Sequence, residues 1–342
     1  MSKLKFIDLY AGIGGIRFGF ESRGAKCVFS SEWNKFAQAT YKAFHGEMPF
    51  GDITDVDVEN DIPKHNILTA GFPCQPFSLA GVSKKNSMGR AHGFNDPTQG
   101  TEFFKVKEIL RIKQPEAFLL ENVKNLKSHD KQRTYKVIEK ELRKVGYDFN
   151  SFIIDSANWL PQHRERIFIV GFRKDLKQAK FLSDLEIPIP KKRSKSLGQI
   201  LLDEEEILEK FGSKYTLTEG TWRALQRHKS KHLAKGNGFG FGLISPPFNG
   251  KVTRTMSARY YKDGGEILIA QEHTETPRKI LPIEALRLQG FPKKCEKFLD
   301  GTKEQPVSDT QFYKQFGNSV SVPVIKVFAK IITDKLSERG IE

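Results

Sequence analysis

The sequence has few cysteines and no long apolar run. Its three cysteines, Cys27, Cys74 and Cys295, lie far apart in 342 residues. This spacing argues against a disulfide framework and a thiolate zinc site, so we expect no metal. No apolar run approaches the ~18 residues that a membrane helix requires, and no segment resembles a signal peptide. We therefore expect a cytoplasmic protein without a membrane partner, in a reducing compartment that leaves thiols free.

Acidic residues are outnumbered by basic ones. The chain has 56 Lys and Arg against 41 Asp and Glu, for a formal net charge of +15. Such an excess favours a polyanionic partner such as nucleic acid, although many basic chains are merely soluble. The length allows one large domain or two smaller ones.

Apolar runs alternate with helix-like stretches over the first 172 residues. Alternation at this spacing predicts βαβ units, and hence an α/β fold with a mainly parallel sheet covered by helices on both faces. Ligands of such sheets bind at the carboxyl ends of the strands. The predicted strands are KFIDLYA, KCVFSSE, HNILTAG, EAFLLENV, DFNSFIIDS and RIFIVGF.

The character of the sequence changes after Arg173. IPIPKKRSKS occupies 187–196, and a glycine-rich stretch, GNGFGFGLISPP, begins at Gly236. We expect a second, smaller domain over 186–275 and a connecting hinge over 276–304. The first domain then consists of 1–185 and 305–342, because the amphipathic segment VPVIKVFAKIITDKL near the end can return to cover it.

A glycine-rich turn follows the first predicted strand. In FIDLYAGIGG, the residues Gly12, Gly14 and Gly15 allow the backbone to pass close to a ligand and to adopt positive φ. The third glycine of the dinucleotide pattern is missing, which argues against NAD or FAD. An ordinary strand-to-helix loop explains this turn equally well when it is taken alone.

The next two predicted strand ends carry acids. Glu32 suits ribose hydroxyls and Trp33 suits an adenine ring, while Asp52 suits the adenine amine. No Walker lysine or phosphate cradle is apparent. A nucleoside without phosphates, such as S-adenosylmethionine, is therefore the better fit.

Five motifs together resemble a known family. FIDLYAGIGG is followed by GFPCQPFS (71–78), ENV (121–123), QHRER (162–166) and QFGNSV (315–320), in the order seen in DNA (cytosine-5)-methyltransferases. The resemblance covers nearly the whole chain. It implies a Rossmann-like class I methyltransferase domain, a target-recognition domain over 186–275, and S-adenosylmethionine as cofactor. The residues that it adds to the expected cofactor site are Phe6, Asp8, Ile53, Pro73, Asn318 and Ser319.

The family likeness also assigns a catalytic set. It implies that the Cys74 thiolate adds to C6 of a cytosine, so that C5 becomes nucleophilic enough to take a methyl group. Glu121 matches the glutamate that contacts N3 and the exocyclic amine. Arg166 matches the arginine that holds O2, with Arg164 beside it. His163 receives no role.

The likeness predicts duplex DNA as the partner. C5 is hidden in the stack, so the target base must be flipped out. The loop over 79–100 is expected to close over the DNA, with Gln75 and Ser78 at its base. The segments YTLTEGTW, KGNGFGFG and TRTMSARYYKDGGEILI resemble the recognition region of Dcm-like and CCGG-modifying enzymes, which suggests a palindrome that starts CC and ends GG. Expected DNA contacts are Arg254, Thr255, Arg259, Tyr260 and Lys262.

A basic segment lies within the predicted second domain. RALQRHKSKHLAK (223–235) has five Lys or Arg and no acid, which fits a segment that follows phosphates. His228 and His232 have metal-ligand spacing, but a solvated helix face explains them better.

An oxidoreductase, a non-catalytic DNA-binding module and an RNA cytosine methyltransferase are the rival functions. We expect a monomer from a bacterium or phage, and whether a separate restriction endonuclease accompanies it stays open.

Overall fold

The computed structural model describes residues 3–73, 101–237, 240–299 and 304–341. The chain forms two compact units. Unit 1 consists of Met1–Ile154, Glu165–Pro188 and Val324–Glu342, and unit 2 consists of Asp155–Arg164 and Ile189–Pro323. Residues 305–323 belong to unit 2 in this division, whereas the sequence placed them in the first domain. The domain boundaries and the hinge stay predictions.

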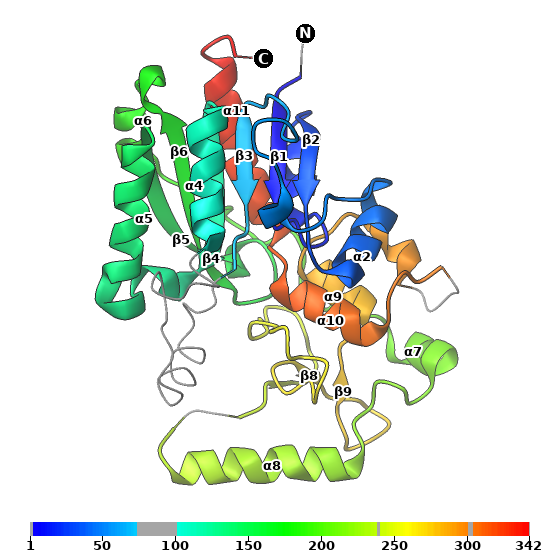
Figure 1. Ribbon diagram of the computed structural model, residues 1–342. Helices are drawn as coiled ribbons and strands as arrows, with labels where there is room; N and C mark the ends of the chain where they lie inside the picture. Colours follow the sequence, from blue (N-terminus) through cyan, green and yellow to red (C-terminus); the bar gives the residue numbers. More distant parts are fainter. Residues whose placement is uncertain (1–2, 74–100, 238–239, 300–303, 342) are drawn as a thin grey trace. The chain divides into compact units, whose positions relative to one another are not determined.

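Unit 1 contains a six-stranded sheet (Figure 1). The strand order is β2-β1-β3-β4-β6-β5, with β1 to β4 parallel and β6 antiparallel to β4. The predicted α/β fold and all six predicted strands are confirmed. The strands are β1 (Lys5–Leu9), β2 (Lys26–Ser31), β3 (Ile67–Ala70), β4 (Ala117–Val123), β5 (Tyr147–Asp155) and β6 (Glu165–Arg173).

Helices cover both faces of this sheet. Alternate residues of a strand point to opposite faces. Ile7 and Leu9 of β1 therefore share one apolar cluster with α4 and α5. On the other face, the ring of Phe168 stacks on Phe328 of α11 at 4.6 Å between centroids. The helices of unit 1 are α1 (Gly15–Glu21), α2 (Lys35–His45), α4 (Thr101–Lys113), α5 (Arg133–Lys144), α6 (Ala179–Asp184) and α11 (Val322–Ser337, from Val324).

Short 3-10 helices join these elements. The 3-10 helix Ile53–Asp55 directly follows Asp52, which is its N-cap and accepts a hydrogen bond from the Thr54 amide. The others in unit 1 are Lys124–Lys127, His129–Gln132 and Lys174–Leu176.

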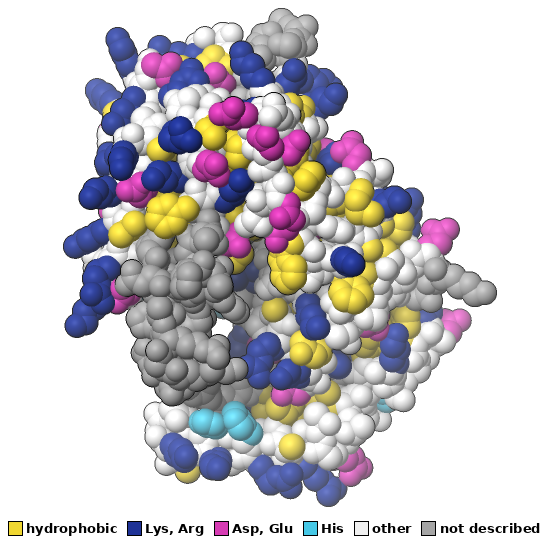
Figure 2. All heavy atoms as spheres, in the orientation of Figure 1, with side chains coloured by type: hydrophobic (Ala, Val, Ile, Leu, Met, Phe, Trp, Pro, Cys, Tyr) yellow, Lys and Arg dark blue, Asp and Glu magenta, His cyan; other side chains and the backbone are white. Residues whose placement is uncertain are grey.

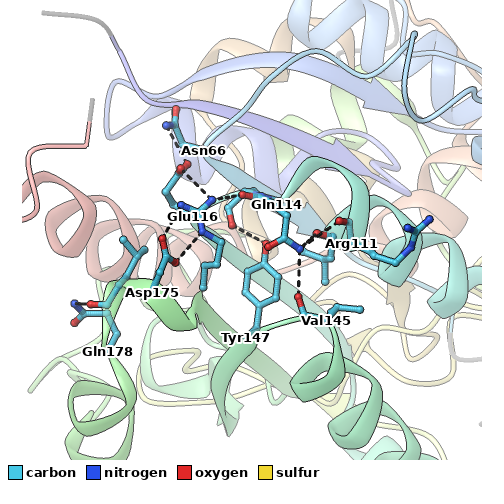
Figure 3. Close-up of polar contacts among 12 residues, drawn as sticks. Asn66, Arg111, Gln114, Glu116, Val145, Tyr147, Asp175 and Gln178 are labelled. Carbon is cyan, nitrogen blue, oxygen red and sulfur yellow. Dashed lines mark hydrogen bonds and ion pairs between the residues drawn. The ribbon is translucent and has the colours of Figure 1, made fainter.

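A polar network holds the amino ends of β3 and β4 (Figure 3). Arg173, the last residue of antiparallel β6, pairs with Glu116 at 3.4 Å and with Asp175 at 2.8 Å. Asn66 donates to Glu116 at 3.3 Å, and the Tyr147 hydroxyl donates to the Pro115 carbonyl at 2.6 Å. The side chains that we expect to bind ligands lie at the opposite, carboxyl ends of the same strands. This network therefore stabilises the end of the sheet opposite the expected ligand site.

Over its described residues, unit 2 is built around short strands and four helices. A buried ion pair joins Arg278 to Glu284, with nitrogen–oxygen distances of 2.8 and 2.9 Å. Its helices are α7 (Glu204–Phe211), α8 (Glu219–Ala234), α9 (Pro282–Leu288) and α10 (Asp309–Asn318). The strands are β7 (Leu243–Ile244), β8 (Leu268–Ile269) and β9 (Arg278–Lys279), and the 3-10 helices are Ser156–Asn158 and Lys293–Phe298.

No single helix of the described residues is long and apolar enough to cross a membrane. The bent pair α10 and α11 meets the criterion together by length and composition alone, as buried core helices also do.

Candidate functional site

The glycine turn begins directly after β1. Gly12 and Gly14 have φ of 57° and 77°, in the left-handed region where a side chain is strained. Gly14 is also the N-cap of α1. The turn therefore needs the glycines that the sequence places there, and it lies at the carboxyl end of the sheet.

Glu32 connects the end of β2 to this turn. Its Oε2 accepts a hydrogen bond of 2.9 Å from the Gly12 amide, and its Oε1 accepts one of 2.8 Å from the Asn34 amide. Burial raises the pKa of the Glu32 carboxyl. Each oxygen keeps a second lone pair, which suits a pair of sugar hydroxyls. The structure thus brings together two parts of the predicted cofactor site.

Trp33 and Asp52 lie on adjoining segments. Glu32 donates its amide to the Phe50 carbonyl at 2.9 Å, which holds the chain before Asp52 alongside the end of β2. The Trp33 side chain is 67% exposed, so one face of the indole is available to a ligand. Oδ1 of exposed Asp52 accepts from the amide and hydroxyl of Thr54 at 2.9 and 2.8 Å.

Three predicted cofactor residues are buried and do not face a ligand. Phe6 is fully buried, and its ring packs on Phe20 at 5.3 Å. Asp8 is also fully buried and accepts a hydrogen bond of 2.9 Å from the Thr69 hydroxyl. Burial raises the pKa of the Asp8 carboxyl to about 7. Ile53 is 2% exposed. The family resemblance added Phe6 and Asp8 to the cofactor site, but both side chains are fully buried in unit 1. We infer that they stabilise the strand that leads to the turn.

Tyr10 is a residue that sequence reasoning passed over. It follows the last residue of β1, has φ of 54°, and donates its hydroxyl to the Glu102 carbonyl at 3.0 Å. Its side chain is partly buried beside the glycine turn. Its position, as an aromatic residue between the end of a strand and the glycine turn, could have identified it from the sequence.

Glu121 and Arg166 form an ion pair at the carboxyl end of β4. Because β6 runs antiparallel to β4, its first residues lie opposite the last residues of β4, with Arg166 opposite Val123. Arg166 Nε lies 3.2 Å from Glu121 Oε1, and the two side chains are 17% and 10% exposed. The structure therefore brings together two of the four predicted catalytic side chains.

The segment after β3 runs beside this pair. A Cβ placed on Gly71 would lie 3.6 Å from Glu121 Oε2. The Asn122 side chain donates 3.1 Å to the carbonyl of Phe72, and Pro73 is exposed. Cys74, Gln75 and Ser78, which continue this segment, lie outside the described residues, so their roles stay predictions.

Arg164 has a different place from the one predicted. It is 2% exposed, and its guanidinium donates to the carbonyls of Met256 at 3.2 Å, Gly317 at 3.0 Å and Ser319. These bonds tie the start of unit 2 to the end of α10. We therefore assign Arg164 to positioning and not to contact with a base.

Predicted recognition residues divide into exposed and buried ones. Arg259 and Lys262 are exposed, and Arg254 is exposed with a bond of 2.6 Å to the Gly240 carbonyl. Tyr260 is fully buried: its hydroxyl donates to the Ile267 carbonyl at 2.6 Å and accepts from the Ile280 amide at 2.8 Å. Tyr260 therefore belongs to the core of unit 2, and its predicted DNA contact is corrected.

Thr255 contacts His163, a residue with no predicted role. The Thr255 hydroxyl donates a hydrogen bond of 2.5 Å to the backbone carbonyl of His163. Nδ1 of His163 lies 2.7 Å from Asp155 Oδ2. Partial burial acts to raise the pKa of Asp155, but hydrogen bonds from His163 and two backbone amides lower it overall. Asn318 is exposed at the end of α10, and Ser319 follows as its cap.

Helix α8 carries a basic stripe. Residues four apart share one side of a helix. Arg223, Arg227 and Lys231 have this spacing, Lys235 follows as the C-cap, and all four are exposed. Figure 2 shows Lys and Arg side chains gathered along the helix at the lower edge. Among the described residues, no group of three or more His, Cys, Asp or Glu could hold a metal ion.

Comparisons with known proteins identify the family of the chain. The C-5 cytosine-specific DNA methylase family matches residues 4–334. The chain is 47% identical to a DNA-cytosine methyltransferase of Escherichia coli strain K12, over 98% of this chain and 78% of that protein. It is 41% identical to the type II methyltransferase M.HpaII of Haemophilus parainfluenzae, over 98% of this chain and 90% of that protein.

The fold has a similar counterpart among solved structures. The methyltransferase EhMeth of Entamoeba histolytica matches with a TM-score of 0.73 at 20% identity, over 98% of this chain and 99% of that one. The family predicted from the five motifs is therefore confirmed: the chain belongs to the C-5 cytosine-specific DNA methylase family and is a DNA (cytosine-5)-methyltransferase.

Proposed function

We propose that this enzyme methylates C5 of a cytosine flipped out of duplex DNA, through a covalent bond between Cys74 and C6. The observation that carries the proposal is the Glu121–Arg166 pair, which lies beside the segment that leads to Cys74. Attack by sulfur on C6 places negative charge on the pyrimidine. C5 would then take the methyl group of S-adenosylmethionine, whose sulfur keeps the bonding electron pair and leaves as S-adenosylhomocysteine. Loss of the C5 proton to a base and departure of the sulfur restore the ring.

The two paired side chains stabilise the developing charge. Arg166 donates to the cytosine O2, whereas Glu121 accepts from the exocyclic amine and, once protonated, donates to N3. Donors that are already fixed before the reaction stabilise charge without reorganising. The 3.2 Å contact keeps the guanidinium and the carboxylate in one place before the base arrives.

S-adenosylmethionine supplies the methyl group as an electrophilic sulfonium. The residues present fit a nucleoside without phosphates. Glu32, held by the Gly12 and Asn34 amides, would take the ribose hydroxyls, and exposed Trp33 would take the adenine face. Asp52 would accept from the adenine amine. Pro73, Asn318 and Ser319 are proposed for the rest of the cofactor.

Unit 2 is proposed to bind the DNA. Arg254, Thr255, Arg259 and Lys262 contact phosphates or bases, and the α8 stripe follows the backbone outside the site. Gln75 and Ser78 contact the flipped nucleotide. A site that starts CC and ends GG, and action as a monomer, complete the proposal. Because relatives such as M.HpaII are named type II methyltransferases, we propose that the enzyme belongs to a restriction-modification system.

One experiment tests this function. Tritiated S-adenosylmethionine is incubated with duplex DNA or with RNA, and the labelled base is identified and mapped by bisulfite sequencing. We expect 5-methylcytosine in duplex DNA. Label on adenine, or on RNA alone, would refute the proposal. Cys74→Ala should abolish turnover while DNA binding persists, and 5-fluorocytosine in the site should trap a covalent complex.

A further inference from the structure

The glycine turn is packed against a side chain from the far end of α2. A Cβ placed on Gly14 would lie 2.0 Å from Nε2 of His45 and 2.7 Å from its Cδ2. His45 is the last residue of α2, and its side chain is 1% exposed. Its ring thus fills the space that any side chain at position 14 would need. This is a second reason for glycine there, besides the φ of 77°.

The ring of His45 is fixed from two helices. Its centroid lies 4.3 Å from that of Phe18 in α1 and 4.5 Å from that of Tyr41 in α2. Its Nδ1 lies 4.0 Å from Glu21 Oε2. The two neighbouring rings and the Glu21 carboxylate hold the imidazole against Gly14.

A charged network joins the same two helices. Arg17 of α1 binds Glu21 at 2.6 Å and Glu47 at 3.0 Å. Its Nη1 also donates to the Tyr41 hydroxyl at 3.0 Å. Arg17 is 6% exposed, so these partners offset the cost of burying its charge. The network holds the end of α2 against α1.

Helix α2 therefore reaches the turn from both ends. At its start, the amide of the N-cap Asn34 donates to Glu32, which accepts from Gly12. At its end, His45 contacts Gly14. One helix thus contacts the turn at Gly14 and also holds Glu32, which accepts a hydrogen bond from Gly12 in the same turn.

We propose that His45 is a positioning residue for cofactor binding. Its ring holds Gly14, and with it the rest of the glycine turn, in a fixed position relative to the Glu32 carboxylate. This inference rests on the proposed function, in which that turn and Glu32 hold S-adenosylmethionine.

The test compares His45 with its neighbour Phe44. Phe44 is 5% exposed and its ring centroid lies 6.4 Å from that of Phe18, so it stabilises the same end of α2. The dissociation constant of S-adenosylmethionine is measured by titration calorimetry for His45→Ala and Phe44→Leu, beside the thermal unfolding of each. We expect His45→Ala to weaken binding about 10-fold and Phe44→Leu less than about 2-fold, at similar losses of stability.

A double-mutant cycle adds a second measurement. Gly14→Ala places a methyl group against the ring, so it should weaken binding more than His45→Ala. In the double variant the methyl group enters the vacated space, and binding should partly recover relative to Gly14→Ala. The positive φ prevents full recovery. The two sites are in contact, so their effects should be coupled and not additive.

Two results would overturn the inference. One is an equal weakening by His45→Ala and Phe44→Leu, because binding would then follow stability alone. The other is a double variant that binds no better than Gly14→Ala. A wild-type protein that binds no S-adenosylmethionine would instead refute the proposed function itself, and the inference with it. If Gly14→Ala does not fold, the comparison of His45 with Phe44 decides.

Discussion

The side-chain amide of Asn122 donates a buried hydrogen bond of 3.1 Å to the carbonyl oxygen of Phe72. This bond joins the end of β4 to the chain that leaves β3, two residues before Cys74 in the sequence. Its partners are next to Glu121 on one side and to Gly71 on the other. Asn122 thus links Glu121, the proposed base-binding residue, to the segment of the proposed nucleophile.

Replacement of Asn122 should affect both stability and activity. Asn122→Ala leaves a buried carbonyl without its donor, which costs about 1–3 kcal/mol of unfolding free energy. We also expect kcat to fall more than the KM for DNA rises, because the segment that carries Cys74 loses its anchor. Urea unfolding and steady-state kinetics measure the two effects. Asn158→Ala, which removes an exposed bond of 3.3 Å, is the control and should change neither.

Arg166 should not tolerate lysine. The ammonium keeps the charge but loses the planar fork that can contact both Glu121 and a carbonyl oxygen. We expect Arg166→Lys to lower kcat/KM about 10²-fold, as removal of a fixed donor does in other enzymes. Arg173→Lys changes the other end of the same strand, in the network of Figure 3, and should lower stability while kcat/KM stays within about 2-fold. Equal losses of activity in both variants would contradict the role of Arg166.

Asp8 should make stability depend on pH. Burial raises its pKa to about 7, so the folded protein favours the protonated carboxyl. The stabilising contribution is complete below about pH 4, the pKa of the unfolded chain, and is lost as the pH rises towards 7. Asp8→Asn keeps an acceptor for the Thr69 hydroxyl but does not ionise. Relative to wild type, this variant should therefore gain stability between pH 5 and pH 8 in urea unfolding. A constant difference between the two proteins would show that Asp8 does not titrate in this range.

The fold was largely predictable because hydrophobic periodicity is local. Each of the six strands is an apolar run of the chain itself, and a glycine turn follows from backbone geometry. The position of Glu32 beside the glycine turn could also be predicted, because an acid at a strand end of a parallel sheet lies at the edge where ligands bind.

Polar residues were harder to place because their partners are distant. Arg164 has the side chain that suits a cytosine carbonyl, but its acceptors include a protein carbonyl 153 residues further along the chain. Tyr260 lies in a basic, glycine-rich stretch, yet its hydroxyl bonds to two backbone groups of the core. Residue type gives the chemistry of a group, and only the tertiary structure decides which partner satisfies it.

The basic stripe of α8 should contribute affinity for DNA without selecting its sequence. Arg227→Gln with Lys231→Gln removes two exposed charges, while Arg223 is already paired with Glu219 at 3.0 Å. Each phosphate contact contributes about −0.9 to the slope of log K against log salt, so this slope should become shallower by about 1.8. We expect kcat at saturating DNA and the methylated site to stay the same.

The control for this stripe removes the same charge elsewhere. Lys136→Gln with Lys140→Gln changes two exposed lysines four residues apart on α5. Because long-range attraction depends on net charge whereas counterion release depends on contacts, this pair should leave the salt slope almost unchanged. Fluorescence anisotropy of labelled duplex DNA at several salt concentrations gives both slopes. Equal shifts in the two double variants would show that α8 acts through net charge alone and does not touch the phosphates.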